Sequence, residues 1–174
     1  MEIGIIGSGN VGGTLGARWV QAGHEVTFGS RDPSADAMRQ LVARAGGAAR
    51  SATLRDVAQA SEVLLLATPW PATKEVLEGL GELGGKVLID ATNPLRPRLD
   101  GLELGNTTSD GEQVAAWACG ASVVKAFNTI GFNIMANPAF GSDHPALFYC
   151  GDDASSKQTV KQLAEGIGFQ FVRR

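Results

Sequence analysis

The chain has 174 residues, of which 44% are hydrophobic and 19% charged, and its formal net charge is −3. This length suits one domain with a core that buries most of its apolar surface. The sequence has no basic run, so nothing favours a nucleic-acid partner, and every apolar run is far too short to cross a membrane. Two cysteines, Cys119 and Cys150, do not make a disulfide framework and fit a reducing compartment. We therefore expect one cytoplasmic domain over residues 1–174, with no separate substrate domain.

The first apolar run, at residues 3–6, leads into a glycine-rich turn and then into a segment, about 11–23, with apolar residues at helical spacing. A strand, a GxGxxG turn and a helix in this order are the context of a dinucleotide site. In such a site Gly7 permits the tight turn, Gly9 lets the backbone approach a pyrophosphate, and Gly12 lets the helix pack against the strand. The pyrophosphate binds free N–H groups at the positive end of the helix. The predicted dinucleotide-binding residues are Gly7, Ser8, Gly9, Asn10, Val11 and Gly12.

The second predicted strand covers residues 24–28, and the residues that follow it indicate which dinucleotide binds. An NAD site is expected to carry an Asp or Glu about 20 residues after the glycines, where the carboxylate binds the ribose hydroxyls. This chain has Ser30 and Arg31 there, and these side chains suit a 2′-phosphate that a carboxylate would repel. We therefore predict NADP(H) rather than NAD(H). The alternative is that this stretch only starts a helix, with Asp32 as its cap and Pro33 in its first turn.

Short apolar runs and amphipathic segments alternate along the rest of the chain. The runs lie at residues 63–67, 87–89, 122–126 and 147–150, and the helical patterns lie at about 38–45, 72–80, 112–117 and 155–167. This alternation predicts an α/β fold of the Rossmann type, a doubly wound and mostly parallel sheet with helices on both faces. Ligands of such sheets bind beyond the carboxyl ends of the strands, so the loops that start at Ala67, Asn93 and Asn128 are expected to line the site.

Motifs along almost the whole chain carry a resemblance to a known family. They are Gly4–Gly12 with Gly29-Ser30-Arg31, then Ala67-Thr68-Pro69-Trp70, and then Asp90–Pro94 with Val124–Thr129. In these motifs the chain resembles the NADP-dependent oxidoreductases that reduce the deazaflavin coenzyme F420. The resemblance implies that the phosphates of NADP(H) are bound by Gly9, Asn10, Val11, Ser30 and Arg31. It also implies that the nicotinamide is bordered by the loops Ala67-Thr68-Pro69-Trp70 and Asn93-Pro94.

The expected activity is hydride transfer between NADPH and a second cofactor, either coenzyme F420 or a flavin. This transfer depends on the alignment of donor and acceptor carbons, so no catalytic residue is assigned. Asn128 and Thr129 are candidates for the acceptor side, although Asn93 and Asn128 could each simply close a turn. Two histidines and two widely separated cysteines offer no metal-ligand spacing, so no metal is expected. The alternative function is a non-catalytic NADP(H)-binding module or a redox sensor.

Each of three further features has two possible interpretations. Asp90 and Lys125 lie near the ends of predicted strands, and they either form a structural ion pair or serve the site. Trp70, between two prolines, either stacks on a bound ring or fills a gap between helix and loop. The irregular segment 94–110 either covers the nicotinamide and the acceptor or is a surface excursion that leads into the next helix.

Polar residues before two predicted helices are expected to act as N-caps. They are Ser109 or Asp110 in the first case, and Asp152 and Asp153 in the second. Cys150 lies in a predicted strand and is expected to be buried and inert.

Members of the resembled family continue past the last strand into a helical stretch that helps to build the acceptor pocket and the dimer. This chain stops at Phe169–Arg174. We therefore expect a second subunit to supply the missing wall, in a homodimer. The segments near Trp117 and at Phe132–Phe140 are candidate contacts, and the alternative is that they complete the core of their own chain.

Overall fold

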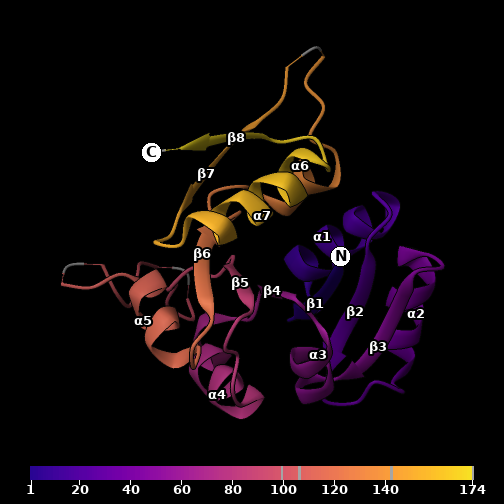
Figure 1. Cartoon of the computed structure of the whole chain (residues 1–174), viewed down its shortest axis with the longest axis horizontal. Helices are drawn as coiled ribbons and strands as arrows, with labels where there is room; N and C mark the ends of the chain where they lie inside the picture. The colour runs from indigo at the N-terminus through magenta and orange to yellow at the C-terminus, as the bar shows by residue number, and fades with distance from the viewer. Residues whose placement is uncertain (99, 106, 142, 174) are drawn as a thin grey trace.

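The computed structural model describes residues 1–98, 100–105, 107–141 and 143–173. Within these residues, eight strands form one sheet in the order β3-β2-β1-β4-β5-β6-β7-β8, and a helix lies between each strand and the next along the chain (Figure 1). The strands are β1 (Glu2–Ile6), β2 (Glu25–Ser30), β3 (Ala49–Thr53), β4 (Val63–Leu66), β5 (Val87–Asp90), β6 (Ser122–Ala126), β7 (Ala146–Cys150) and β8 (Gln170–Arg173). The helices are α1 (Asn10–Gln21), α2 (Asp36–Ala45), α3 (Leu54–Ala60), α4 (Trp70–Leu80), α5 (Asp110–Trp117), α6 (Phe132–Ala136) and α7 (Ala154–Glu165).

The strand pairing confirms the predicted doubly wound, mostly parallel sheet. Strands β1 to β6 pair in parallel, β7 is antiparallel to β6, and β8 is parallel to β7. From β1 the chain first builds outward to β2 and β3, and then returns to the other side of β1 to build β4 and its neighbours. The direction of building therefore reverses between β1 and β4. Open α/β sheets bind ligands at such a reversal, beyond the carboxyl ends of the strands.

Helices cover both faces of the sheet, which explains why its central strands are continuously apolar. Successive strand side chains point to opposite faces. Ile5 accordingly belongs to the core layer formed with α1, α2, α6 and α7, whereas Ile6 belongs to the layer formed with α3, α4 and α5. All four residues of β4 are buried, as expected for a parallel strand in the middle of such a sheet. In the described part of the chain, no helix has both the length and the hydrophobicity needed to cross a membrane.

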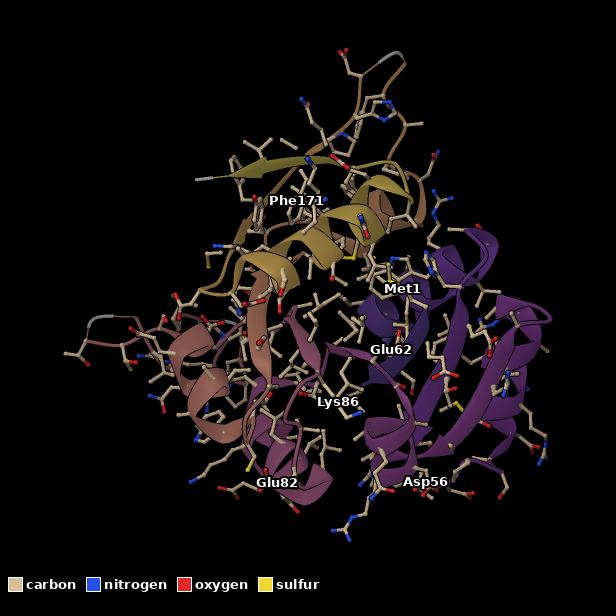
Figure 2. The ribbon with its side chains drawn as sticks, viewed as in Figure 1. Met1, Asp56, Glu62, Glu82, Lys86 and Phe171 are labelled. Atoms are coloured by element: carbon tan, nitrogen blue, oxygen red, sulfur yellow. The ribbon has the colours of Figure 1, made fainter. Side chains whose placement is uncertain are left out.

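The amino ends of the central strands lie at the opposite edge from the ligand side. Met1, Glu62 and Lys86 precede β1, β4 and β5, and in Figure 2 they lie in a row through the middle of the view. The ammonium of Lys86 donates hydrogen bonds to the carbonyl oxygens of Gln59 and Ser61, at 3.0 and 2.8 Å. These carbonyls end α3, where a positive charge also stabilises the helix dipole.

The start of α2 differs from the prediction, because Asp32 does not cap this helix. The N-cap is Ala35, without a side-chain hydrogen bond. The Asp32 carboxylate instead accepts hydrogen bonds from the hydroxyl and the N–H of Ser34, at 2.6 and 3.0 Å, and closes a turn around Pro33. The Ser34 hydroxyl makes the largest contribution to lowering the pKa of Asp32. The Asp32 carboxylate thus stabilises a turn instead of capping the helix, and α2 begins only at Asp36.

At the two other predicted helix starts, Ser109 rather than Asp110 and Asp153 rather than Asp152 are the N-caps. Ser109 and Glu112 form a capping box at the start of α5: the Ser109 hydroxyl accepts from the Glu112 N–H at 3.1 Å, and the Glu112 carboxylate accepts from the Ser109 N–H at 2.7 Å. Asp153 accepts from the N–H of Ser156 at 2.6 Å at the start of α7. Hydrogen bonds, first of all from the Ser155 hydroxyl, lower the pKa of Asp153 to about 2.

Cys150 is exposed, so the expectation that it is buried was wrong. It ends β7, where exposed and less exposed residues alternate, and it shares a face of the strand with the exposed Phe148 rather than with the buried Leu147. Three elements, β3, α3 and α6, were not predicted at all. The first is rich in small and polar residues and the other two are short, so none carries a strong apolar period.

Candidate functional site

The turn between β1 and α1 lies at the switch point of the sheet, and two of its glycines are required by packing. Gly7 has a φ of 107°, and a Cβ atom there would lie 2.5 Å from the carbonyl oxygen of Ala67. A Cβ atom at Gly12 would lie 1.9 Å from the carbonyl oxygen of Gly7. The predicted conformational roles of Gly7 and Gly12 are therefore confirmed.

Gly9 differs from its two neighbours in the motif. Its backbone is extended, with a φ of −74°, and a Cβ atom there would meet nothing within 4 Å. Gly9 is the N-cap of α1, and the first helical hydrogen bond runs from the Gly13 N–H to the Gly9 carbonyl at 2.8 Å. The N–H groups of residues 10–12 therefore have no partner inside α1, a helix whose residues are all described. The glycine leaves open space over three free donors, which is the arrangement that an anionic group requires.

A cavity of about 560 Å³, here called the Arg31 cavity, opens between this turn, the end of β2 and α4. Gly7, Ser8, Ser30 and Arg31 line it, as predicted from the motif. Arg31 is exposed, and among the described residues it has no ion-pair partner. The Ser30 hydroxyl accepts from the Asp32 N–H at 3.1 Å and donates to the Asp32 carbonyl at 3.0 Å.

A second cavity, here called the Asn93 cavity, has a volume of about 810 Å³ and lies on the other side of the same turn. It shares Gly7, Ser8, Thr68 and Pro69 with the Arg31 cavity, so the two adjoin around the switch point. The remaining predicted residues that line it are Gly9, Asn10, Val11, Ala67, Trp70 and Asn93. The structure thus brings together, around two adjoining cavities, residues from four segments that are far apart in the sequence: the glycine turn, residues 30–31, residues 67–70 and Asn93.

Four predicted residues do not line either cavity. Gly12, in the first turn of α1, is buried, and Pro94, the residue after Asn93, is buried as well. Asn128 supports Asn93 instead, because its carbonyl oxygen accepts from the Asn93 side-chain amide at 2.9 Å. Thr129 is exposed and outside the lining of both cavities.

The sequence did not predict several lining residues. From α4, the residues that face the Arg31 cavity are Ala72, Glu75, Val76, Gly79 and Leu80. Their spacing is that of one helix face, so the helical period could have identified them. The segment after Asn93 contributes Leu95, Arg96 and Pro97 to the Asn93 cavity. Residues 95–97 of the segment 94–110 therefore line this cavity, and residues 99 and 106 of the segment lie outside the described residues.

The Asp90–Lys125 pair is a structural ion pair, one of the two interpretations left open. Asp90 is fully buried, and its carboxylate accepts from the Lys125 ammonium at 2.9 Å. The same carboxylate accepts from the N–H and the hydroxyl of Thr92, at 2.9 and 2.7 Å. Lys125 also donates to the Thr92 carbonyl at 2.7 Å and pairs with Asp110, at the start of α5. This buried cluster fixes the turn that presents Asn93 and anchors both ends of segment 94–110.

Trp70 fills a gap in the core, although one side of it lines the Asn93 cavity. It is 8% exposed, and its ring lies 5.4 Å from that of Trp117, between α4 and α5. The ammonium of Lys74 lies 6.0 Å from the Trp117 ring. Among the described residues, no three His, Cys, Asp or Glu side chains come together as a group that could hold a metal ion.

The glycine turn at the switch point, with a cavity on each side, defines the class of protein as a dinucleotide-binding protein of the Rossmann type. The chain belongs to the family described as NADP oxidoreductase, coenzyme F420-dependent, whose model matches residues 2–94. This membership confirms the resemblance that the motifs indicated. The family is one of NADP-dependent oxidoreductases.

Three relatives show how far the similarity extends. The F420-dependent NADP reductase of Methanothermobacter marburgensis is 30% identical in an alignment 181 residues long, which covers 96% of this chain and 80% of that protein. The metalloreductase STEAP3 of Rattus norvegicus is 29% identical over 169 residues, which are 97% of this chain but only 32% of the relative, so this chain spans about a third of that protein. The crystal structure of a hypothetical protein from Sinorhizobium meliloti is 29% identical and superposes with a TM-score of 0.87, covering 99% of this chain and 84% of that one.

Proposed function

We propose that the protein transfers a hydride between NADPH and a deazaflavin, such as coenzyme F420, or a flavin. The observation that carries the proposal is the Asn93 cavity, which adjoins the Arg31 cavity around the glycine turn. A dinucleotide that extends from one cavity into the other leaves its nicotinamide in the larger cavity. That cavity has room for the ring of a second reactant, because small-molecule sites typically measure about 300–1,000 Å³.

The residues present fit NADP(H) at each part of the molecule. The Arg31 guanidinium is unpaired among the described residues and suits the 2′-phosphate, with Ser30 beside it. The open space at Gly9 and the free N–H groups of residues 10–12 suit the pyrophosphate. Thr68, Pro69, Trp70 and Asn93 border the nicotinamide in this proposal, with Asn128 holding the Asn93 amide in place.

The chemistry asks little of the protein beyond alignment. When bound, NADPH supplies the hydride, and the reaction needs the donor and acceptor carbons to be held face to face in a dry cavity. Apolar and neutral polar residues of the glycine turn, of loop 67–71 and of loop 91–97 provide these walls. No general acid or base is therefore assigned among the lining residues.

The test is NADPH oxidation under anaerobic conditions with a panel of acceptors. We expect oxidation with coenzyme F420 or a flavin, and little with small carbonyl compounds. A ferric chelate belongs in the panel because one relative, of which this chain spans about a third, is named a metalloreductase. Tight NADPH binding without turnover of any acceptor would favour the alternative, a non-catalytic NADP(H)-binding module or redox sensor. Failure to bind NADPH would contradict both.

A further inference from the structure

We infer that Arg96 determines acceptor specificity by pairing with an acidic group on the acceptor, so that the acceptor is an anionic ring compound. This inference rests on the proposed function, because it names the substrate class of the same site. It starts from the charges around the Asn93 cavity. Among the described residues that line this cavity, Arg96 is the one charged side chain, and the others are apolar or neutral.

A hydrogen-bonded hairpin holds the backbone of Arg96. The Arg96 N–H donates to the Gly101 carbonyl at 3.0 Å, and the Glu103 N–H donates to the Pro94 carbonyl at 2.7 Å. Leu95 and Leu102 form an antiparallel bridge between the same two segments. The hairpin starts close after the end of β5 and projects from the body of the molecule beside α5, at the left of Figure 1. Arg96 therefore lines the cavity from a backbone that is held in place.

The guanidinium of Arg96 lies against the backbone of Gly101. Its Nη1 atom is 3.4 Å from the place that a Cβ atom of residue 101 would occupy. Arg96 is exposed, and within the described parts of the chain no carboxylate forms an ion pair with it. Asp100 and Glu103 lie on the same hairpin and line its outer side together with Arg96, but they leave its charge unpaired.

The other anion-binding groups around the two cavities are already matched to the dinucleotide. Arg31 lines the Arg31 cavity, and the start of α1 lies at the glycine turn, where Gly9, Asn10 and Val11 line the Asn93 cavity; together they suit the three phosphates of NADPH. Arg96 lines the Asn93 cavity from a different segment, the loop that follows Asn93. A guanidinium beside an apolar cavity forms strong, charge-assisted hydrogen bonds with carboxylate or phosphate groups. The positive charge of Arg96, which no phosphate of NADPH requires, is therefore assigned to an acidic group of the acceptor.

The experiment compares acceptors that share a ring and differ only in a phosphate. The pairs are FMN with riboflavin, and 5-deaza-FMN with 5-deazariboflavin. Binding of each to the protein loaded with NADP⁺ is measured by fluorescence, and NADPH-dependent reduction is measured for any that turn over. The wild type is expected to bind the phosphorylated member about ten- to a hundredfold more tightly. Arg96→Ala is expected to lose this preference through KM, with kcat and the Kd of NADPH unchanged.

Arg98→Ala is the matched control, because Arg98 lies on the same hairpin but does not line the Asn93 cavity. It is expected to keep the preference. The inference is overturned if the wild type binds the phosphorylated member no better than the other, whether both bind or neither does. It is also overturned if Arg96→Ala weakens NADPH as much as it weakens FMN, since Arg96 then serves the dinucleotide. Failure of the proposed function is a separate result, because it appears as NADPH binding without turnover while the binding preference is still measured.

Discussion

At the scale of single residues, the GxGxxG turn uses its glycines for different purposes. A side chain at Gly7 or Gly12 would collide with backbone oxygens of the protein itself, whereas a side chain at Gly9 would enter empty space. Packing therefore explains the first two glycines and leaves the third without a role in the isolated chain. A bound pyrophosphate that needs the space over the start of α1 would supply that role, which is the role proposed for Gly9.

This contrast makes Gly9→Val an informative substitution. The extended backbone of Gly9 accepts a valine, so the variant is expected to fold with a near-normal melting temperature. Its side chain would occupy the pyrophosphate space, and we expect NADPH binding in calorimetry to weaken by about a hundredfold or more. Gly12→Val is the comparison, and it is expected to misfold. Normal NADPH affinity in a folded Gly9→Val variant would show that this turn does not bind the pyrophosphate.

Arg31→Asp tests the choice between NADP(H) and NAD(H). The substitution removes a charge-assisted hydrogen bond to the 2′-phosphate and adds repulsion, so NADPH affinity is expected to fall about ten- to a hundredfold while NADH affinity changes little. Arg39→Asp makes the same change of charge on α2, where Arg39 pairs with the exposed Asp36 and lines neither cavity. It should leave both affinities unaltered. Equal binding of NADH and NADPH by the wild type would refute the assignment.

Residues whose place follows from local chain geometry could be predicted from the sequence, and residues placed by tertiary contacts could not. The glycine turn and Arg31 stand at fixed distances from a strand, so a motif locates them. Arg96 lines the Asn93 cavity because residues 94–98 pair with residues 100–103 in a hairpin. No short sequence motif predicts that pairing. The contact of Asn128, a candidate for the acceptor side, with Asn93 was likewise not predicted: its carbonyl accepts from the Asn93 side-chain amide.

At the scale of elements, hydrogen-bonding side chains decided where helices begin, and the same residue type gave opposite results. Asp153 caps α7, whereas Asp32 closes a turn around Pro33 and leaves α2 to start later. Both aspartates precede a polar segment, so the sequence alone offers little to separate them. The strands were easier to predict, since burial on both faces produces continuous apolar runs such as β4.

The buried cluster around Lys125 joins β5, β6 and α5, and its removal should be costly. Lys125→Met leaves Asp90, which is fully buried, and Asp110 without their cation. Breaking a buried pair in this way costs about 3–5 kcal/mol, which urea unfolding would measure. Lys161→Met breaks the exposed Lys161–Glu165 pair, 3.8 Å apart, and should cost less than about 0.5 kcal/mol. A loss below about 1 kcal/mol for Lys125→Met would show that the cluster does not anchor these elements.

At the scale of the whole molecule, the alternation of strands and helices predicted the doubly wound sheet, and the position of the site followed from it. The reversal of strand order beside β1 brings the glycine turn, loop 67–71 and loop 91–97 to one edge. The volume and lining of the cavities could not be predicted, because they depend on the phase of α4 and on the hairpin after Asn93. Trp117, one candidate for a subunit contact, is partly buried and packs against Trp70 and the core cluster of its own chain.

The segment 132–140 remains the candidate for a homodimer contact. Met135 in α6 is buried, but Phe132 and Phe140 are 48% and 52% exposed, which is high for aromatic side chains. Phe140 lies on the connection from α6 to β7, which projects at the top of Figure 1. Two exposed aromatic rings on one segment suit a self-complementary, two-fold contact between copies, in which buried aromatic residues contribute most of the affinity.

We therefore predict a monomer–dimer equilibrium in sedimentation velocity over a range of concentrations. Phe132→Ser and Phe140→Ser should each weaken the dimer about tenfold or more and leave the melting temperature of the monomer nearly unchanged, because neither ring is buried in its own chain. Leu102→Ser removes an equally exposed apolar side chain, 52% exposed, from the hairpin beside the Asn93 cavity, and should leave the equilibrium unaltered. A wild type that sediments as a monomer at every concentration would contradict the prediction. A dimer that is insensitive to both phenylalanine substitutions would assign the contact to another surface.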